Sequence, residues 1–558
     1  MHYNLVKASN RRYLEELKNR GHEMKPVYDA VNIMQETEWV INKPIYEVIL
    51  SLINTDSSLG HLPTNPQEIE LPVKPVDIET NKESLVKWKR EASLVYKERA
   101  KSKSKYIQVR QIIEEARLLL DRSFFYPYQL DFRGRIYPKP AMLSPQGADY
   151  SRALIKFKYG KQMKENISFD DFAIAGAGLY GQVDKEDIQT RKEWVRERLD
   201  TFIGYAKEPL TNTDWAKADK PFCFLAWCFE LKDFAETDYD ASFITTLPIQ
   251  SDCSNSGLQH YSAMMRDEIG GKATNLIPSN KPEDVYRIVA QKVIMKLRDK
   301  TDPMAKQWLD YGIDRKLCKK PVMCLPYSLT QYSCRQYIQD HVEKEWKEKN
   351  KPHNFGRDLF KATNYLTPIV WESINDVIVG AKEIMGFLKK VSRLVASENL
   401  PVCWTTPKPL NFPVQMMCYK KESKRVKTKM GDSIIKLSIQ SDTDEIDKRK
   451  TAQSICPNLI HSLDASCLML AVIKAKDKGV TNFSLIHDSF GCVAPDVHKL
   501  SEAIREAFCE VYEQDVLTNW AMEMKQMLSD KNAKKFPHIP ERGNLDLSLV
   551  KQSIFFCV

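Results

Sequence analysis

The pattern of apolar and polar positions predicts helices along most of the chain. Residues 1 to about 120 read as amphipathic helices interrupted by a proline-rich loop at 60–77. Residues 124–160 alternate aromatic and polar side chains and then contain turn residues, as a pair of strands does. Helical patterns return up to about residue 235 and dominate again up to about residue 395. The first half is therefore mainly helical.

Further short apolar strands are predicted after about residue 240. One is predicted at 243–254, and two more at 402–421 and 432–441, where the turn "MGD" joins two lysine-rich arms. An apolar helix at 458–477 leads into a strand at 483–487. The pattern predicts an α+β fold that is mainly helical.

Length and composition indicate a large soluble protein. At 558 residues the chain is long enough for several subdomains, and 43% of it is hydrophobic and 28% charged. The first twenty residues are charged throughout, and no window reaches about 18 uninterrupted apolar residues. We expect neither secretion nor contact with a membrane, and a cytoplasmic location, that of the host cell if the protein is viral.

Cysteine spacing and charge add two expectations. Thirteen cysteines occur without a C-x-x-C pair or a Cys/His cluster, so we expect reduced thiols and no structural zinc. Lys and Arg number 83 against 74 Asp and Glu, a formal net charge of +9. The positive charge is dense at 87–106 and 419–432, which suits either a solvated surface or contact with phosphates.

Two aspartates stand where buried strands end. Asp488 follows the apolar "LIH" of "LIHDSF" (485–490), and Asp252 follows "PIQS" (248–251). A carboxylate at such a place loses hydration unless a cation or several donors replace it. Each aspartate alone also suits a helix N-cap or a turn. As a pair they are typical ligands of Mg²⁺, which binds through one or two carboxylates plus substrate phosphates.

A basic stretch at 314–332 could complement such a site. Four of its side chains repeat every fourth position, which puts them on one face of a helix: Arg315, Lys319, Met323 and Tyr327. The basic groups would hold phosphates and the aromatic ring would meet a base or sugar, although an ordinary basic helix shows the same pattern. Pro321 and Pro326 predict a helix that is kinked or starts late.

These segments resemble the single-subunit, phage-type RNA polymerases, a family that mitochondria also use. Three motifs occur in the family's order: "DCSNSGLQHYSAMMRDEIGG" (252–271), "RKLCKKPVMCLPYS" (315–328) and "LIHDSFG" (485–491). Flanking signatures match as well: "DFRGRIYP" (131–138), "SPQGADY" (144–150), "PFCFLAWCFE" (221–230), "CPNLIHSLDAS" (456–466) and the aromatic tail "FFCV". The resemblance covers roughly residues 25–558.

The resemblance implies roles for particular residues. Asp252 and Asp488 would bind two Mg²⁺ ions, with the backbone carbonyl of Cys253 as a further ligand. Lys319 would assist the departure of pyrophosphate, so that the catalytic residues are Asp252, Lys319 and Asp488. The implied nucleotide-binding residues are Arg135, Tyr286, Arg315, Tyr327 and His461.

Gly257 bears on the choice between ribose and deoxyribose. In the related family A DNA polymerases a glutamate stands five positions after the first aspartate and fills the space of a 2′-hydroxyl. Gly257 has no side chain there, so we expect room for a ribose whose hydroxyl Tyr327 senses. Pro321, Pro326 and Ser328 depart from the family's second motif.

The family's architecture is a right-hand polymerase fold with an antiparallel palm sheet. Carried over, it predicts a short N-terminal remnant (1–29), a thumb-like region (30–118), palm (119–281 and 462–558, with the C-terminal tail) and fingers (282–461). A basic hairpin at 405–440 takes the place of the family's promoter-reading loop. The large N-terminal promoter-binding domain of the family is expected to be missing.

The implied function is that of a DNA-directed RNA polymerase, which transfers ribonucleotides by a two-metal mechanism, on genes of phage or organelle type. Its partners would be a DNA template, nascent RNA and ribonucleoside triphosphates. An accessory protein, or a melted or single-stranded template, would supply initiation. Two alternatives stay open: a family A-like DNA polymerase and an inactive nucleic-acid-binding homologue.

Overall fold

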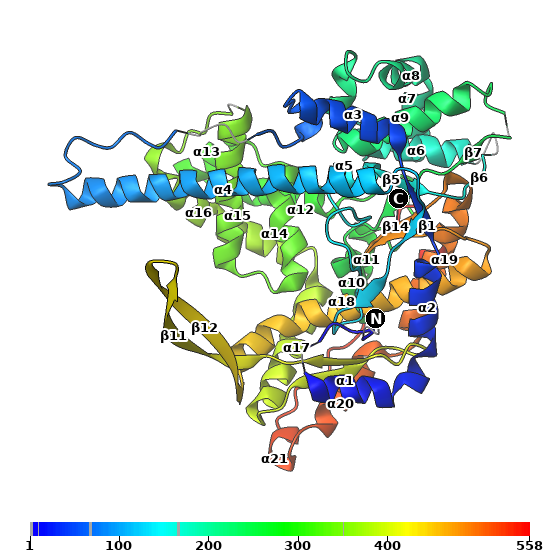
Figure 1. Ribbon diagram of the computed structural model, residues 1–558. Helices are drawn as coiled ribbons and strands as arrows, with labels where there is room; N and C mark the ends of the chain where they lie inside the picture. The colour runs from blue at the N-terminus through cyan, green and yellow to red at the C-terminus, as the bar shows by residue number, and fades with distance from the viewer. Residues whose placement is uncertain are drawn as a thin grey trace.

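A computed structural model describes residues 4–8, 10–65, 70–163, 168–240, 242–349 and 351–557. It is mainly helical with small antiparallel sheets, which confirms the predicted fold class (Figure 1). The first three residues, part of the proline-rich loop (66–69) and Val558 of the tail lie outside the described residues. The described parts of that loop contain no strand and only the short 3₁₀ turn Leu59–His61.

The N-terminal region ends in one long helix. Its elements are α1 (Arg11–Asn19), α2 (Lys25–Gln35), β1 (Glu38–Ile41), α3 (Lys43–Asn54) and α4 (Lys82–Leu118). Asn81 caps α4 by accepting from the N–H groups of Glu83 and Ser84. The buried residues of α4 lie almost entirely in its last third, so the basic run 87–106 projects from the body (Figure 1).

Two small antiparallel sheets follow. β1 pairs with β2 (Phe124–Phe125) and β5 (Ile155–Phe157) in a three-stranded sheet. β3 (Tyr128–Leu130) and β4 (Ile136–Pro138) form a separate pair. The strands expected within 124–160 are therefore confirmed. The remaining elements of this part are α5 (Asp149–Ala153), β6 (Lys161–Gln162), α6 (Ser168–Tyr180), α7 (Ile188–Arg196), α8 (Leu199–Lys207), α9 (Pro221–Ala235) and β7 (Ile244–Thr245).

A second sheet joins segments that are distant in the sequence. Its strand order is β13 (Ser484–Ile486), β14 (Ser489–Cys492) and β8 (Ile249–Asp252), with antiparallel pairing throughout. β8 leads into α10 (Ser256–Met265) and α11 (Glu268–Ala273). α10 packs on α17 (Val379–Ser397) and α18 (Lys448–Asp477), and α18 packs on α19 (Val497–Glu513). The end of the sheet at Asp252 therefore continues into helices that pack on one another.

The middle of the chain is helical, with α12 (Val285–Arg298), α13 (Pro303–Tyr311), α14 (Arg315–Cys324), α15 (Gln331–Lys349) and α16 (Leu359–Asn375). α14 begins at Arg315 behind its N-cap Asp314, so of the two expected outcomes, a kinked helix or a late start, the late start does not occur. Pro321 lies inside the helix, where it costs one backbone hydrogen bond. The helix ends before the 3₁₀ turn Leu325–Tyr327, and Ser328 adopts a left-handed conformation.

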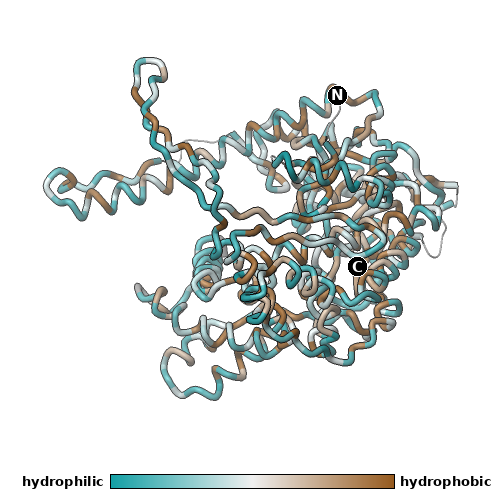
Figure 2. The backbone as a smooth tube through the Cα atoms, turned by 90° about the horizontal axis from the view of Figure 1, so that it is seen from below, coloured by the Kyte–Doolittle hydropathy of each residue, from teal (hydrophilic) through white to brown (hydrophobic). Residues whose placement is uncertain are grey.

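Two hairpins follow. The single strand expected at 402–421 is wrong: β9 (Val402–Thr405) and β10 (Pro413–Met416) pair with each other across a turn, and a new strand starts at Tyr419. That strand, β11 (Tyr419–Met430), pairs with β12 (Ser433–Ile446) around Gly431, which confirms the "MGD" turn. The β11–β12 hairpin stands away from the body (Figures 1 and 2).

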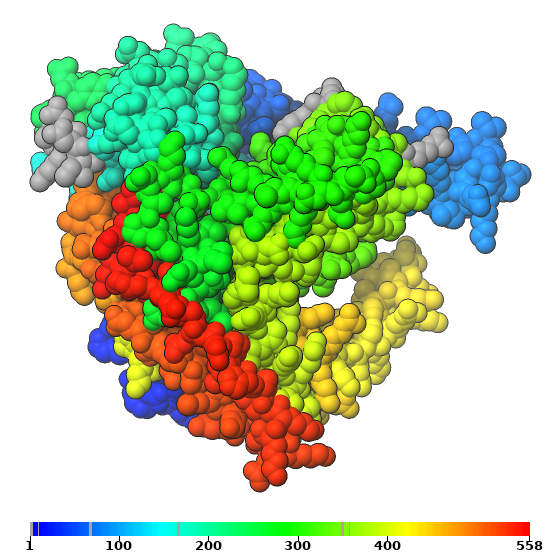
Figure 3. All heavy atoms as spheres, turned by 180° about the vertical axis from the view of Figure 1, so that it is seen from behind, coloured from blue at the N-terminus to red at the C-terminus, as the bar shows by residue number. Residues whose placement is uncertain are grey.

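The C-terminal part closes the fold. α18 is long and apolar enough to span a membrane, but 83% of its most apolar window is buried, as in a core helix. After α19 come α20 (Val516–Gln526), α21 (Asp530–Ala533) and the 3₁₀ segment Leu547–Gln552. The last residues, red in Figure 3, run across the back of the molecule and over the segment that follows β8.

Candidate active site

The two aspartates meet at one end of the second sheet. Asp252 is the register partner of Ser489, the residue after Asp488. Paired Cα atoms lie about 4.5–5.5 Å apart, so the Cα atoms of Asp252 and Asp488 lie within about 10 Å. The N–H of Cys253 also donates to the carbonyl oxygen of Asp488 at 3.1 Å. The predicted convergence is therefore confirmed.

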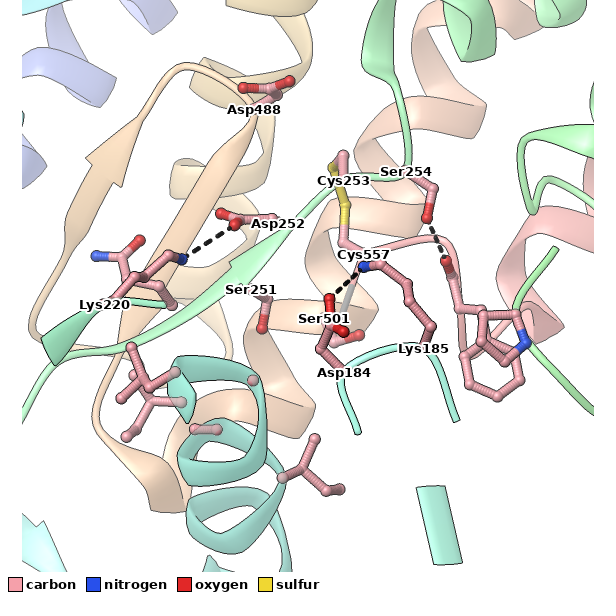
Figure 4. A pocket seen from close by; sticks show the side chains of 18 of the residues that line it. Asp184, Lys185, Lys220, Ser251, Asp252, Cys253, Ser254, Asp488, Ser501 and Cys557 are labelled. Carbon is pink, nitrogen blue, oxygen red and sulfur yellow. Dashed lines mark hydrogen bonds and ion pairs between the residues drawn. A yellow bond between two sulfur atoms is a disulfide. The ribbon is translucent and has the colours of Figure 1, made fainter. Parts of the chain in front are cut away.

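The two carboxylates have different surroundings. Asp252 is 58% exposed and points toward Lys220, whose Nζ lies 3.5 Å from Oδ2 (Figure 4). Asp488 lies in the two-residue loop between β13 and β14 and accepts a hydrogen bond from Ser256 Oγ at 2.9 Å. Burial, with the negative charge of Asp464 nearby, raises the pKa of Asp488 to about 6. A desolvated carboxylate without a cationic partner is stabilised by binding a cation.

Basic groups on α14, next to the start of α12, line the same cavity as the carboxylates. Asp284 caps α12 and forms an ion pair with Arg315, the first residue of α14. The guanidinium of Arg315 lies 5.1 Å from the ring centre of Tyr286, in cation–π geometry. One turn further on, burial and the charge of Arg315 lower the pKa of Lys319. Arg315, which is paired with Asp284, and Lys319 therefore lie near enough for the charge of one to act on the other, an arrangement that suits a polyanionic ligand.

A cavity of about 840 Å³ joins these groups. Eight of the residues singled out from the sequence line it: Asp252, Cys253, Tyr286, Arg315, Lys319, Met323, Tyr327 and Asp488. Arg135 and His461 do not line it. They lie behind Tyr327, whose ring centre is 5.0 Å from that of His461.

Arg135 is engaged in a buried ion pair. Its Nη2 lies 2.7 Å from Oδ2 of Asp464 on α18, and the Asp464 side chain is only 5% exposed. Arg135 directly precedes β4, so this ion pair links β4 to α18. In this structure Arg135 contacts α18 and not the cavity that we expected it to share with the nucleotide-binding residues.

His461 is held neutral and in one orientation. Nη1 of Arg133 donates to its Nδ1 at 2.7 Å, so the ring hydrogen lies on Nε2. Burial, together with the charges of Arg135 and Arg133, lowers the pKa of His461 far below its ordinary value. A neutral imidazole with its hydrogen on Nε2 is left beside the ring of Tyr327.

The space beside Gly257 is already occupied. A Cβ atom at this position would lie 3.1 Å from Cβ of Pro326 and 3.3 Å from the hydroxyl of Tyr327. The hydroxyl that we expect to sense a ribose thus lies at the position where Gly257 has no side chain. Gly257 allows the Tyr327 hydroxyl to approach the backbone of α10. A larger residue would displace that hydroxyl.

Several site residues were not assigned a role from the sequence, among them Arg133, Lys220, Ser256 and Asp464. Asp464 lies inside the quoted signature "CPNLIHSLDAS", so that signature was a usable signal. Lys220 precedes α9 and is 32 positions from Asp252, and no local pattern connects the two. Within the described ranges, no group of three or more His, Cys, Asp or Glu side chains forms a metal cluster.

A disulfide ties the C-terminal tail to this site. Cys253, next to Asp252, is bonded to Cys557 across 304 positions (Figure 4). The expectation of reduced thiols is wrong for this pair, while the other cysteines are free. Main-chain contacts accompany the bond: the N–H and Oγ of Ser254 donate to the carbonyls of Phe556 and Phe555 at 3.3 and 3.2 Å. Spacing alone could not indicate a pair formed by tertiary contact.

Replacing Cys557 by Ser is expected to lower the free energy of unfolding by about 2–4 kcal/mol, because a very long loop is no longer closed. Urea unfolding with and without reductant measures this. Cys403→Ser, which removes a free thiol, is the matched control and should respond to reductant as the parent does. Non-reducing digestion that yields the peptides of Cys253 and Cys557 unlinked would contradict the disulfide.

Comparisons with known proteins agree with this geometry. The family model described as DNA-dependent RNA polymerase matches residues 164–535, more than half of the chain. The chain belongs to this family. It is 34% identical to the DNA-directed RNA polymerase of Enterobacteria phage T3 and to T7 RNA polymerase of Escherichia phage T7, in each case over 95% of this chain and 64% of the relative.

Plant organelle enzymes are also similar. The chain is 33% identical to DNA-directed RNA polymerase 2, chloroplastic/mitochondrial, of Arabidopsis thaliana, over 96% of this chain and 52% of that protein. The chain thus spans less than two thirds of the length of these relatives. Among solved structures, the POL domain of Pol1 from M. smegmatis, in complex with DNA primer-template and dNTP, has a TM-score of 0.42 at 13% identity, over 90% of this chain and 70% of that one.

Proposed function

We propose that this protein is a DNA-directed RNA polymerase that transfers ribonucleotides to a growing RNA on a DNA template. The observation that carries the proposal is the convergence of Asp252 and Asp488 in a cavity that Arg315 and Lys319 also line. Carboxylates that can hold cations, together with basic side chains in the same cavity, suit a triphosphate. Membership of the family favours this reading over a family A-like DNA polymerase.

The residues present suit Mg²⁺. Two carboxylates, one of them desolvated, and the carbonyl of Cys253 offer oxygen ligands and leave positions for water and phosphate. Asp252, Asp488 and that carbonyl would hold two Mg²⁺ ions, which when bound stabilise negative charge on the reacting oxygens.

The other side chains would position the triphosphate. The 3′-hydroxyl of the RNA gives up its proton to water as its oxygen attacks the α-phosphorus, a new P–O bond forms, and the bond to pyrophosphate breaks. Arg315 would hold the triphosphate, while Lys319, with its lowered pKa, would donate a proton to the departing pyrophosphate. Tyr286 keeps Arg315 in place by cation–π contact and borders the position of the incoming nucleotide.

Template copying by the purified chain tests the proposal. We expect Mg²⁺-dependent incorporation of ribonucleotides on single-stranded DNA and on duplex DNA with a pre-melted bubble. On closed duplex we expect initiation to need an accessory protein. We propose that the main ligands of the protein are the DNA template and the nascent RNA. The proposed location is the host cytoplasm. Absence of synthesis on every template would reject the proposal, and efficient unaided initiation on closed duplex would reject the accessory partner.

Tyr327→Phe is expected to reduce the preference for ribonucleotides over deoxyribonucleotides by about 10-fold, since one hydrogen bond to the 2′-hydroxyl is lost. Competition between the two nucleotides on one template measures the ratio. Tyr337→Phe on α15 makes the same chemical change at a residue that does not line the cavity and should leave the ratio alone. An unchanged ratio in Tyr327→Phe would show that the hydroxyl does not sense the sugar.

A further inference from the structure

The backbone of Lys220 is held in place just before α9. Its N–H donates to the carbonyl oxygen of Leu179 at 3.1 Å, and the N–H of Asp219 donates to the carbonyl oxygen of Tyr180 at 3.0 Å. On the other side, the carboxylate of Asp149 accepts from two of the first N–H groups of α9, at 2.7 and 3.2 Å. Most of α9 is buried. The Cα atom of Lys220 is therefore anchored on both sides.

The side chain of Lys220 points toward Asp252 in the cavity that both residues line (Figure 4). Its Nζ lies 3.5 Å from Oδ2 of Asp252, and the two side chains are 34% and 58% exposed. Among the described residues, each of the two forms this ion pair and no other. An ion pair whose partners are both partly in water is weak. A stronger ligand for either partner can therefore replace the contact.

The cavity would take both kinds of stronger ligand. The carboxylate of Asp252 suits a divalent cation, which carries twice the charge of an ammonium group. The ammonium of Lys220 suits a phosphate oxygen, and the triphosphate would lie in the same cavity, beside Arg315 and Lys319. A lysine ammonium has three rotatable donors on a flexible stem of four carbons, so it can change partners without any movement of the backbone.

We propose that Lys220 is an exchangeable counter-ion: its ammonium pairs with Asp252 until the ribonucleoside triphosphate binds, and then pairs with a phosphate of that nucleotide. Without the nucleotide, Lys220 offsets the charge of Asp252 and weakens the binding of a divalent cation there. With the nucleotide bound, this competition ends, so that the triphosphate and the divalent cation favour the binding of each other. The inference rests on the proposed function, since it takes a ribonucleoside triphosphate as the ligand.

Two binding measurements on Lys220→Met test the exchange without requiring catalysis. The first is a titration with Mn²⁺ and no nucleotide, in which electron paramagnetic resonance reports the free ion. The variant is expected to bind Mn²⁺ about 3–5-fold more tightly than wild type, because the competing ammonium is gone. The second is calorimetric titration with α,β-methylene ATP at a fixed excess of Mg²⁺. Its affinity is expected to fall about 5-fold, because a contact with phosphate is lost.

Three further variants serve as controls. Lys217→Met removes the same charge three positions earlier, from an exposed ion pair with Asp214 outside the cavity, and should behave as wild type in both titrations. Lys220→Arg keeps the charge and should bind Mn²⁺ within about twofold of wild type. When Asp252 is replaced by Asn, Lys220→Met should no longer change the affinity for Mn²⁺, since the pair is already broken. Thermal melting checks that each variant folds.

The opposite signs of the two effects distinguish the exchange from damage to the site, which would weaken both ligands. An affinity for Mn²⁺ that is unchanged or lower in Lys220→Met would overturn the proposal, and so would an unchanged affinity for the nucleotide analogue. Copying of a single-stranded template by wild type reports the proposed function separately. Failure to copy, with both binding effects present, would count against the polymerase activity alone.

Discussion

Asp488→Asn is expected to reduce ribonucleotide incorporation by about 10³-fold or more, a loss of about 4 kcal/mol of transition-state stabilisation. The reason is the position of Asp488 at the meeting point of β14 and β8, where it lines the same cavity as Asp252, Arg315 and Lys319. Asparagine keeps the shape and the hydrogen bond from Ser256 but removes the charge. Single-nucleotide extension of an RNA primer at saturating Mg²⁺ measures the effect.

The same substitution should make the protein more stable at neutral pH. The pKa of Asp488 is raised to about 6 in the folded state, so its contribution to stability is full below the ordinary carboxyl pKa and is lost as pH rises through about 6. Removing the charge should therefore raise the free energy of unfolding by on the order of 2 kcal/mol at pH 8 and leave it nearly unchanged at pH 4.

The control for Asp488→Asn is Asp233→Asn, an exposed acid on α9 outside the cavity, which should alter neither quantity. Loss of activity together with gained stability separates a functional charge from damage to the fold. An Asp488→Asn protein with full activity would remove the basis of the proposed mechanism. If the wild-type protein is itself inactive, the protein would be an inactive homologue.

Arg135→Met is expected to lower the free energy of unfolding by about 3–5 kcal/mol. The guanidinium is the ion-pair partner of Asp464, which is almost completely buried on α18. Without Arg135 the Asp464 carboxylate remains desolvated and unpaired. The free-energy cost of such a buried charge exceeds the net stabilisation that the ion pair provides. Urea unfolding at pH 8 measures the change.

The pH dependence of this effect has a definite sign. Burial already raises the pKa of Asp464, and loss of Arg135 raises it further. A raised carboxyl pKa means that stability is present at low pH and is lost as pH rises through the folded pKa. The penalty of Arg135→Met should therefore be smaller at pH 5 than at pH 8.

Adding Asp464→Asn to Arg135→Met is the matched test, because it removes the uncompensated charge. We expect the double variant to recover more than half of the lost stability at pH 8. If the single and double variants unfold at the same urea concentration, then the packing of the Arg135 side chain, and not the ion pair, holds β4 to α18.

Local patterns predicted a large part of the fold. The aspartates at strand ends, the basic helix and the turn at Gly431 follow from alternation, periodicity and turn chemistry, and the structure contains each of them. Two predicted strands are wrong: 243–254 consists of β7 and β8, which belong to different sheets, and 402–421 is divided by the turn between β9 and β10. Short-range patterns do not show which of two candidate strands pairs with which.

The sequence by itself determined which residue types occur together in each motif, since that depends on neighbours a few positions apart. Only the tertiary structure decided that Asp464 neutralises Arg135, that Lys220 reaches Asp252, that Cys253 meets Cys557, and that the Tyr327 hydroxyl fills the space at Gly257. These contacts join segments tens to hundreds of residues apart. Their partners are selected by packing of the whole chain, which no local periodicity records.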